Sequence, residues 1–331
     1  MRLRVSLFLF FLIPTLAFGG CISGDCEEGE GVYENDKGEQ YQGPWKNGQA
    51  HGFGIYTSPK GDFYEGAWRD GKIEGYGIFK YANGNVYKRE FKNFTFHGYG
   101  HMSFKNGDVY EGEYALGKRN GYGMFHSSDG AIYKGEWLNS RKHNYGRYWF
   151  SNGDSYMGDF NHGTFHGYGV FKRSDGATYE GHYRDGQREG YGVFNDPSGD
   201  LIKGNWINGK LNGKASYSYR NGSYYYGDFV NDVKSGIGEM KWTDGSTYKG
   251  RFSNNELEGY GIKRYANGDY YRGYFRKGLK HGSGTFVQKS GDYYKGDWKQ
   301  GQKHGSAICV YGGKKYSCTF VNDNLSSYRA I

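Results

Sequence analysis

Six histidines recur at one position of the chain, and a row of imidazoles is the feature that most suggests metal chemistry. They are His51, His97, His143, His166, His281 and His304. A zinc ion needs ligand atoms about 2 Å away, whereas equivalent positions in successive hairpins of a sheet lie two strands, or roughly 9.5 Å, apart. Other copies of the position carry Glu74, Asn120, Glu189 or Asn212. We interpret it as a polar position that caps a turn, and we expect no metal.

Carboxylates recur in the same way, for example at Glu65, Glu111 and Glu136. A catalytic pair should instead be a unique constellation in a pocket. No G-x-S-x-G, HExxH or Walker motif interrupts the sequence. Glycine triplets such as Gly75-Tyr76-Gly77 have no helical pattern after them, which argues against a phosphate-binding loop. We therefore expect no catalytic residues and no cofactor, so the protein should not be an enzyme.

These residues recur because the whole chain is built from repeats of one sequence pattern. A tyrosine returns every 23 residues, at positions 41, 64, 87, 110, 133, 156, 179, 225, 248, 271 and 294, and Ile202 takes the remaining place. Self-similarity at a fixed period of this length indicates a repeat architecture.

Each repeat has the pattern of a β-hairpin, and Tyr64–Phe79 shows it best. Tyr64, Gly66 and Trp68 alternate with polar or small residues, as do Gly75, Gly77 and Phe79. Period-two alternation bounded by Asp-Gly and Asn-Gly turns predicts two antiparallel strands per repeat.

The spacing also predicts the register. Tyr64 should lie opposite Tyr56 and Phe79, Gly66 opposite Gly54, and Trp68 opposite Gly52 and Gly75. The rings of Tyr64, Trp68 and Phe79 should then cover glycines on the neighbouring strands, which are Gly52, Gly54, Gly66, Gly75 and Gly77. The opposite face carries charged residues such as Glu65, Glu111, Lys134 and Lys249 and is expected to be solvated.

The sequences YEGEY at 110–114, YKGEW at 133–137, and HGYG at 97–100 and 166–169 resemble the MORN repeat family. The resemblance implies an all-β fold, an elongated, twisted single antiparallel sheet of about twelve 23-residue hairpins, like a solenoid. On this basis residues 21–28 form a linker, 29–40 an N-terminal half repeat, 41–315 the repeat array, and 316–331 a C-terminal half repeat and tail.

The composition agrees with a repeat sheet. The 331 residues include 59 glycines, and aromatic residues make up 19%. Leu, Ile and Val are too few for an ordinary aliphatic core, and the rings supply the surface to bury. The net charge is +8, but 43 basic and 35 acidic residues are interleaved without a long basic run. This predicts a mixed solvated surface and no nucleic-acid partner.

The N-terminus has the pattern of an export signal over residues 1–20. Two arginines precede an apolar run, Val5–Phe18, that is too short for a membrane-spanning helix. Two processing schemes fit. Signal peptidase would cleave before Gly20, which leaves a secreted protein, or Phe18-Gly19-Gly20-Cys21 would serve as a relaxed lipobox, which anchors the protein in the cell envelope through a lipid on Cys21.

The other cysteines agree with an oxidising compartment. Cys309 and Cys318 could form a disulfide across the last hairpin. Lipidation of Cys21 would leave Cys26 unpaired. The two pairs lie at opposite ends of the repeat array without C-x-x-C spacing, so metal binding is not expected.

Departures from the repeat are the most specific residues. Arg89 replaces a strand glycine and should lie over Gly77 and Gly100 among aromatic rings, either as a cation–π plug or as a contact for an anion or lipid headgroup. Phe94 and Ser140 replace turn glycines, and Asn144 replaces another strand glycine. We treat Arg89, Phe94, Ser140 and Asn144 as the candidate binding patch.

We expect a non-catalytic exported scaffold or binding protein that uses its aromatic/glycine face to contact a protein or a membrane surface. Resemblance to MORN proteins adds acidic phospholipid as a partner. Two alternatives remain open, an accessory or targeting subunit of a membrane-associated enzyme and a glycan-binding adhesin.

Overall fold

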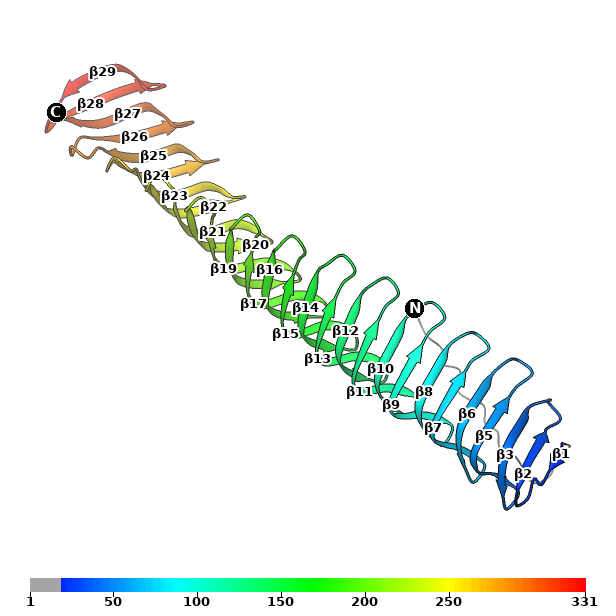
Figure 1. The fold of residues 1–331 in the computed structure, drawn as a ribbon. Coiled ribbons are helices and arrows are strands. Elements are labelled where there is room, and N and C mark those ends of the chain that lie inside the picture. The colour runs from blue at the N-terminus through cyan, green and yellow to red at the C-terminus, as the bar shows by residue number, and fades with distance from the viewer. Residues whose placement is uncertain (1–18) are drawn as a thin grey trace. The chain divides into compact units, whose positions relative to one another are not determined.

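A computed structural model describes residues 19–331. Its described secondary structure consists of β-strands and no helix, and the strands form one antiparallel sheet of 29. Figure 1 shows the strands following one another in chain order. The chain divides into two compact units, of which the first ends at Phe165 (unit 1) and the second is His166–Ile331 (unit 2). The all-β repeat fold predicted from the sequence is confirmed.

The strands that begin in unit 1 pair largely with the next strand along the chain, the two-residue β4 forming a side pairing with β3. They are β1 (Gly20–Gly24), β2 (Glu30–Glu34), β3 (Gln40–Lys46), β4 (Gln49–Ala50), β5 (Gly52–Thr57), β6 (Phe63–Arg69), β7 (Lys72–Lys80), β8 (Val86–Lys92), β9 (Thr95–Ser103), β10 (Val109–Ala115), β11 (Lys118–His126), β12 (Ile132–Leu138), β13 (Arg141–Trp149), β14 (Ser155–Asn161) and β15 (Thr164–Lys172).

The strands of unit 2 follow the same order. They are β16 (Thr178–Arg184), β17 (Gln187–Asn195), β18 (Leu201–Ile207), β19 (Lys210–Ser218), β20 (Tyr224–Val230), β21 (Val233–Lys241), β22 (Thr247–Ser253), β23 (Glu256–Arg264), β24 (Tyr270–Arg276), β25 (Leu279–Val287), β26 (Tyr293–Lys299), β27 (Gln302–Tyr311), β28 (Lys314–Val321) and β29 (Asn324–Ala330). The linker expected over residues 21–28 thus includes most of β1, which pairs with β2.

Two kinds of turn join the strands. Within a hairpin, Asp70 and Gly71 have φ of 49° and 71°, which makes a two-residue turn of type I′. Between hairpins, the Gly84 N–H donates to the Tyr81 carbonyl at 2.9 Å, and Gly84 has a φ of 89°. Positive φ is least costly for glycine, which explains the glycine in this second turn of each repeat.

Most of the predicted register is confirmed, and one pair is wrong. Tyr64 lies opposite Tyr56 and Phe79, and Trp68 opposite Gly52. Trp68 does not face Gly75. It faces Ile73, because the register between β6 and β7 shifts after Gly66, which pairs with Gly77. One residue of β6, Ala67, therefore opposes three residues of β7, Glu74 to Tyr76, and the resulting bulge holds Gly75 at a φ of 88°.

Tyrosine rings cover the strand glycines, although not all those predicted. The Tyr64 side chain is fully buried. A Cβ on Gly77 would lie 2.6 Å from its Cζ, and one on Gly66 would lie 2.7 Å from the same atom. Gly54 is covered by Tyr41 of the preceding repeat. Gly75 lies under no ring, because the bulge turns it toward the Cβ of Ala67, 3.4 Å from where its own would be.

The polar atoms of the buried Tyr64 and Trp68 rings are satisfied by the backbone. The Tyr64 hydroxyl donates to the Ala67 carbonyl three residues along its strand, at 3.0 Å. Trp68 Nε1 donates to the Gly54 carbonyl of the preceding repeat at 3.4 Å, and its ring meets Tyr41 edge-on at 4.9 Å between centroids. Each repeat is therefore packed against the one before it, as stability by neighbour contact requires.

Candidate binding surfaces

A row of cations lies on the aromatic face, and the sequence interpretation did not recognise it. One position near the start of the second strand of each hairpin carries a basic residue in six repeats, Arg119, Lys142, Arg188, Lys234, Lys280 and Lys303. We call these six residues the cation row. In the other repeats the position is apolar, as at Ile73 and Leu211. Comparing the repeats at this position alone would have revealed the alternation of cations with apolar residues.

Each cation of the row lies over aromatic rings. Arg119 Cζ is 4.1 Å from the centroid of Trp137, and Lys142 Nζ is 3.4 Å from that of Tyr148. In unit 2, Arg188 Cζ lies 3.9 Å from the ring centroid of Trp206, and Lys280 Nζ lies 3.9 Å from that of Trp298. Desolvated cation–π contacts of this kind are worth about 2 kcal/mol each. They allow the charge to remain half-buried.

Burial lowers the pKa values of five of these cations. It lowers the pKa of Lys142 and of Lys280 to about 8, and lowers the pKa values of Arg119, Arg188 and Lys234. Among the described residues, no carboxylate oxygen lies within 4.0 Å of the charged nitrogens of this row. The row therefore holds positive charge that no ion pair in this part of the chain neutralises.

An open depression of about 440 Å³ lies beside Lys280 in unit 2. It is lined by Asp244, Tyr265, Ala266, Asn267, Asp269, Lys280 and Phe286. Lys280 therefore shares this depression with two carboxylates, those of Asp244 and Asp269.

Arg89 points away from the rings among which the sequence placed it. Its backbone register, opposite Gly77 and Gly100, is as predicted. At the equivalent Gly66, a Cβ would lie 2.7 Å from Tyr64 Cζ, so there is no room for a side chain on that face. Arg89 instead takes a φ of 107°, is exposed, and places Cζ 5.3 Å from the ring of Tyr99 on the opposite face. The expected cation–π contact exists with a different partner.

The other three members of the candidate patch lie at or near the turns between strands. Phe94 has a φ of 60°, and its ring lies 6.4 Å from that of Trp68. Ser140 has a φ of 64°, and its Oγ accepts the Arg119 N–H at 3.2 Å. Asn144 has a φ of 47° and donates from Nδ2 to Glu136 Oε2 at 2.9 Å.

These four residues do not form one patch. Arg89 lies in β8, and Phe94 follows that strand. Ser140 lies just before β13, and Asn144 lies within β13 near its start. Five strand spacings, or about 24 Å, separate β8 from β13. Each departure is therefore a local adjustment of its own hairpin.

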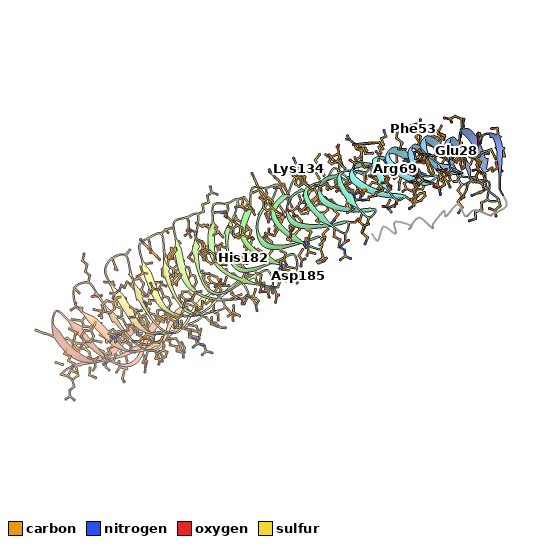
Figure 2. All side chains as sticks on the ribbon, turned by 90° about the horizontal axis from the view of Figure 1, so that it is seen from below. Glu28, Phe53, Arg69, Lys134, His182 and Asp185 are labelled. Atoms are coloured by element: carbon orange, nitrogen blue, oxygen red, sulfur yellow. A yellow bond between two sulfur atoms is a disulfide. The ribbon has the colours of Figure 1, made fainter. Side chains whose placement is uncertain are left out.

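A second surface lies on the opposite face of unit 1, where only solvated charges were expected. Tyrosines and acidic residues alternate there from strand to strand, with one residue from each of β7 to β14. We call this row the tyrosine–acid stripe, and its members are Tyr76, Glu90, Tyr99, Glu113, Tyr122, Glu136, Tyr145 and Asp159. The four tyrosines are 42–68% exposed. Figure 2 shows side chains projecting from this side of unit 1, with Phe53 and Lys134 labelled.

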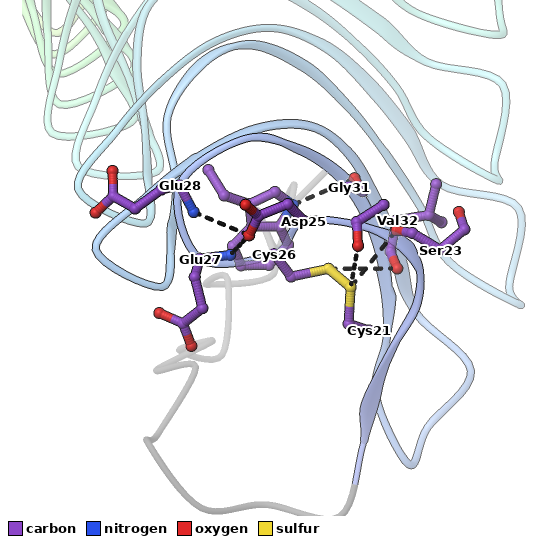
Figure 3. Close-up of a disulfide and its surroundings, with 10 residues drawn as sticks. Cys21, Ser23, Asp25, Cys26, Glu27, Glu28, Gly31 and Val32 are labelled. Atoms are coloured by element: carbon purple, nitrogen blue, oxygen red, sulfur yellow. Dashed lines mark hydrogen bonds between the residues drawn. A yellow bond between two sulfur atoms is a disulfide. The ribbon is translucent and has the colours of Figure 1, made fainter.

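The cysteines pair differently from the prediction. Cys21, near the start of β1, forms a disulfide with Cys26 in the turn that follows this strand, with 5.9 Å between Cα atoms (Figure 3). Beside it, Asp25 Oδ1 accepts the Glu27 and Glu28 N–H groups at 2.9 and 3.1 Å. Cys309 and Cys318 are buried free thiols. They stand diagonally, because Cys309 lies opposite Tyr316 and Cys318 opposite Ala307, and not directly across from each other.

Residues 1–18 of the expected export signal lie outside the described residues. Within residues 19–331, no helix is long and apolar enough to cross a membrane. In the same range, no group of three His, Cys, Asp or Glu side chains is placed to hold a metal ion. Five of the recurring histidines are the third residue of a strand, for example His97 in β9, and only His51 lies between two strands. The Nδ1 atom of His51 is 3.6 Å from Asp70 Oδ1.

The family model for the MORN repeat matches twelve successive segments between residues 41 and 313. The chain belongs to the MORN repeat family. The third match begins at residue 90 and the eighth at 203, immediately after the departures at Arg89 and Ile202. A MORN array of this extent is the architecture of a repeat-based binding or scaffold protein.

Solved structures with some likeness include two TCP domains. The SAS-4 TCP domain of Drosophila melanogaster, in complex with a proline-rich motif of Ana2, is 14% identical over 53% of this chain and 82% of that chain, with a TM-score of 0.27. The TCP10 domain of Danio rerio CPAP, with a peptide of STIL, is 11% identical over 79% and 95%, with a TM-score of 0.23. With TM-scores this low, the likenesses carry no argument about function. None of the curated proteins compared with the chain matches it.

Proposed function

We propose that this MORN protein is an exported, non-catalytic binding or scaffold protein of the cell envelope, and that its aromatic face binds an acidic segment of a partner protein. The observation that supports this most is the cation row. Its charges lie on tryptophan and tyrosine rings without carboxylate partners among residues 19–331. Burying a cation without a paired charge lowers the free energy of unfolding. Cations that are kept in spite of this cost are good candidates for residues that bind a ligand.

An acidic protein segment fits this face better than a flat membrane does. The cations are half-buried between rings, so a ligand must project its carboxylates toward them. Glutamate and aspartate side chains on an extended segment do so, whereas lipid phosphates are held in the plane of a bilayer. Acidic phospholipid remains the alternative ligand, and the experiment separates the two.

The test uses two neighbouring cations of unit 2. Lys280→Met with Lys303→Met removes their charge and keeps the aliphatic stem, and Lys295→Met serves as the control, because Lys295 is exposed on β26. Binding of a glutamate-rich peptide is followed by the fluorescence of Trp298, the ring under Lys280. We expect the double variant to bind about tenfold more weakly, as two charge-assisted contacts worth about 1–2 kcal/mol in total would require.

Two results would count against the proposal. One is peptide binding that is equal in the double variant and the wild type. The other is binding of vesicles that contain acidic phospholipid, at moderate salt, without binding of the peptide, which would assign the row to lipid.

A further inference from the structure

The tyrosine–acid stripe of unit 1 is a candidate for a second binding surface, on the face opposite the cation row. Its tyrosines lie directly across the sheet from its carboxylates, Tyr99 opposite Glu113 and Tyr122 opposite Glu136. Tyr76 and Tyr145 are 68% and 55% exposed, although tyrosine usually buries its ring in a folded protein. Exposed aromatic residues in a continuous row indicate a contact surface.

Backbone and side-chain hydrogen bonds hold the carboxylates in place. Glu113 Oε1 accepts the Tyr122 N–H at 3.0 Å, across the bulge between β10 and β11. Glu136 Oε2 accepts from Asn144 Nδ2 at 2.9 Å. One oxygen of each carboxylate therefore fixes its position between two tyrosines, and the other can accept from a ligand. The bulge glycines make this possible, because Gly121 leaves space beside Glu113 that a Cβ would fill.

The spacing of the tyrosines selects the shape of a ligand. Successive tyrosines are two strands, or about 9.4–9.8 Å, apart. A polyproline II helix has three residues per turn and a rise of about 3.1 Å, so it presents the same edge about every 9.3 Å. Over the three intervals of the stripe the mismatch is about 1 Å in total. An α-helix advances about 10.8 Å in two turns, and an extended strand advances about 6.7 Å in two residues. Neither repeat distance matches the spacing of the tyrosines.

The charge of the stripe selects the composition of that ligand. A carboxylate follows each tyrosine, which favours a lysine or arginine in each turn of the ligand. The neighbouring row on the same face is mixed, with Lys88, Glu111 and Lys134, so the acidic excess is confined to the stripe. Arg89 already lies on Tyr99. That contact demonstrates that a guanidinium fits against a ring of the stripe.

We propose that the tyrosine–acid stripe of unit 1 binds a basic, proline-rich segment of a partner protein in the polyproline II conformation, with prolines on the tyrosines and basic side chains on the carboxylates. The ligand crosses the strands at right angles. Unit 2 has no such pair of a tyrosine with an acidic residue among these positions. Its Tyr168 and Tyr191 face His182, labelled in Figure 2, and Asn205. Its acidic residues at the equivalent positions, Asp228 and Asp297, face Lys214 and Ser283. The site is therefore confined to unit 1, and unit 2 provides an internal control.

The experiment measures binding of three synthetic peptides to the intact mature chain by calorimetry. The test peptide has four Pro-Pro-Arg repeats. One control has four Gly-Gly-Arg repeats, which keep the charge and lose the helix, and the other has four Pro-Pro-Ser repeats, which keep the helix and lose the charge. The protein variants are Tyr99→Thr with Tyr122→Thr, Glu113→Gln, and Tyr191→Thr in unit 2. All four substitutions are at exposed strand positions and suit a strand, so the fold should be kept.

We expect the Pro-Pro-Arg peptide to bind at least tenfold more tightly than either control. The double tyrosine variant should lose about tenfold or more in affinity, Glu113→Gln severalfold, and Tyr191→Thr less than twofold. Equal binding of the Gly-Gly-Arg peptide would overturn the proposal, as would unchanged affinity in the double variant. Tyrosine-dependent binding of a neutral β-linked oligosaccharide without the peptide would assign the stripe to a glycan instead. Because the stripe and the cation row share no residue, none of these results bears on the acidic ligand proposed above.

Discussion

At the scale of single residues, the half-buried lysines are the most unusual feature. Lys142 lies on the Tyr148 ring, with Tyr133 and Phe160 nearby. Its pKa is about 8, because burial disfavours its charged form and Arg119 adds a smaller repulsion. The ordinary value is 10.5. The folded chain therefore releases this proton at a lower pH than the unfolded chain does.

We predict that Lys142→Met raises the free energy of unfolding at pH 7, and that the difference in free energy between variant and wild type shrinks as the pH rises. Between pH 8 and 10.5 the unfolded wild type holds more protons than the folded form, so the free energy of unfolding of the wild type rises with pH. Methionine does not titrate, so the variant lacks this rise. Urea unfolding of both proteins across that pH range measures the difference in free energy. The control is Lys134→Met, because Lys134 is exposed. A gain that is constant with pH would contradict the pKa of Lys142.

At the scale of the hairpin, the second residue of the type I′ turn is decisive. It is usually glycine, but Ser140, Asp232, Asn255 and Asp323 take it with φ of 64–70°. Each side chain accepts the N–H of a residue in the preceding hairpin, as Asp232 Oδ1 does from Leu211 at 2.7 Å. The hydrogen bond offsets the cost of positive φ, which explains why these polar residues replace glycine.

Asp232 therefore allows a discriminating pair of substitutions. Asp232→Ala should destabilise the protein by about 1–2 kcal/mol, because the left-handed turn keeps its cost and the hydrogen bond to Leu211 is lost. Asp232→Gly loses the same bond but removes the backbone cost, so it should stay within about 0.5 kcal/mol of the wild type. Urea unfolding followed by the fluorescence of the nearby Trp206 measures both. If both variants lost the same free energy of unfolding, the cost of positive φ at this position would not determine the stability of the turn.

The sequence predicts the hairpins well and their bulges poorly. Turn chemistry and spacing give the pairing of Tyr64 with Tyr56 and Phe79 correctly. The alternation of Gly75, Gly77 and Phe79 fits a regular strand equally well, so nothing in it indicates the bulge that pairs Trp68 with Ile73. Both candidate surfaces depend on residues that become neighbours across strands. They emerge only when one position is compared through all the repeats.

At the scale of the molecule, Cys21 can have only one of two roles, a disulfide or a lipid anchor. Its sulfur forms the disulfide with Cys26 in the structure, and the same sulfur would carry the lipid of a lipoprotein. One atom cannot do both, so the two fates exclude each other.

Mass spectrometry of the mature protein with an alkylating reagent distinguishes them. If the protein is a secreted form with the disulfide, we expect an N-terminus at Gly20 and no alkylation of Cys21 or Cys26 without reductant. If it is lipidated, the mass of the acyl chains appears on Cys21, and Cys26 reacts. Cys309 and Cys318 are buried, and burial raises the pKa of Cys309 to about 12, so in either case they should react slowly until the chain is unfolded.

The chain-order pairing of the strands has a mechanical consequence. Within each unit, a strand such as β10 bonds only to β9 and β11. A force that pulls the two ends of a unit apart across its strands is then carried by one ladder of hydrogen bonds after another, in series. Such a chain should extend by peeling one hairpin at a time at low force, and should shorten again as each hairpin closes. A MORN array of this kind would act as an extensible tether between partners bound near the two ends of a unit.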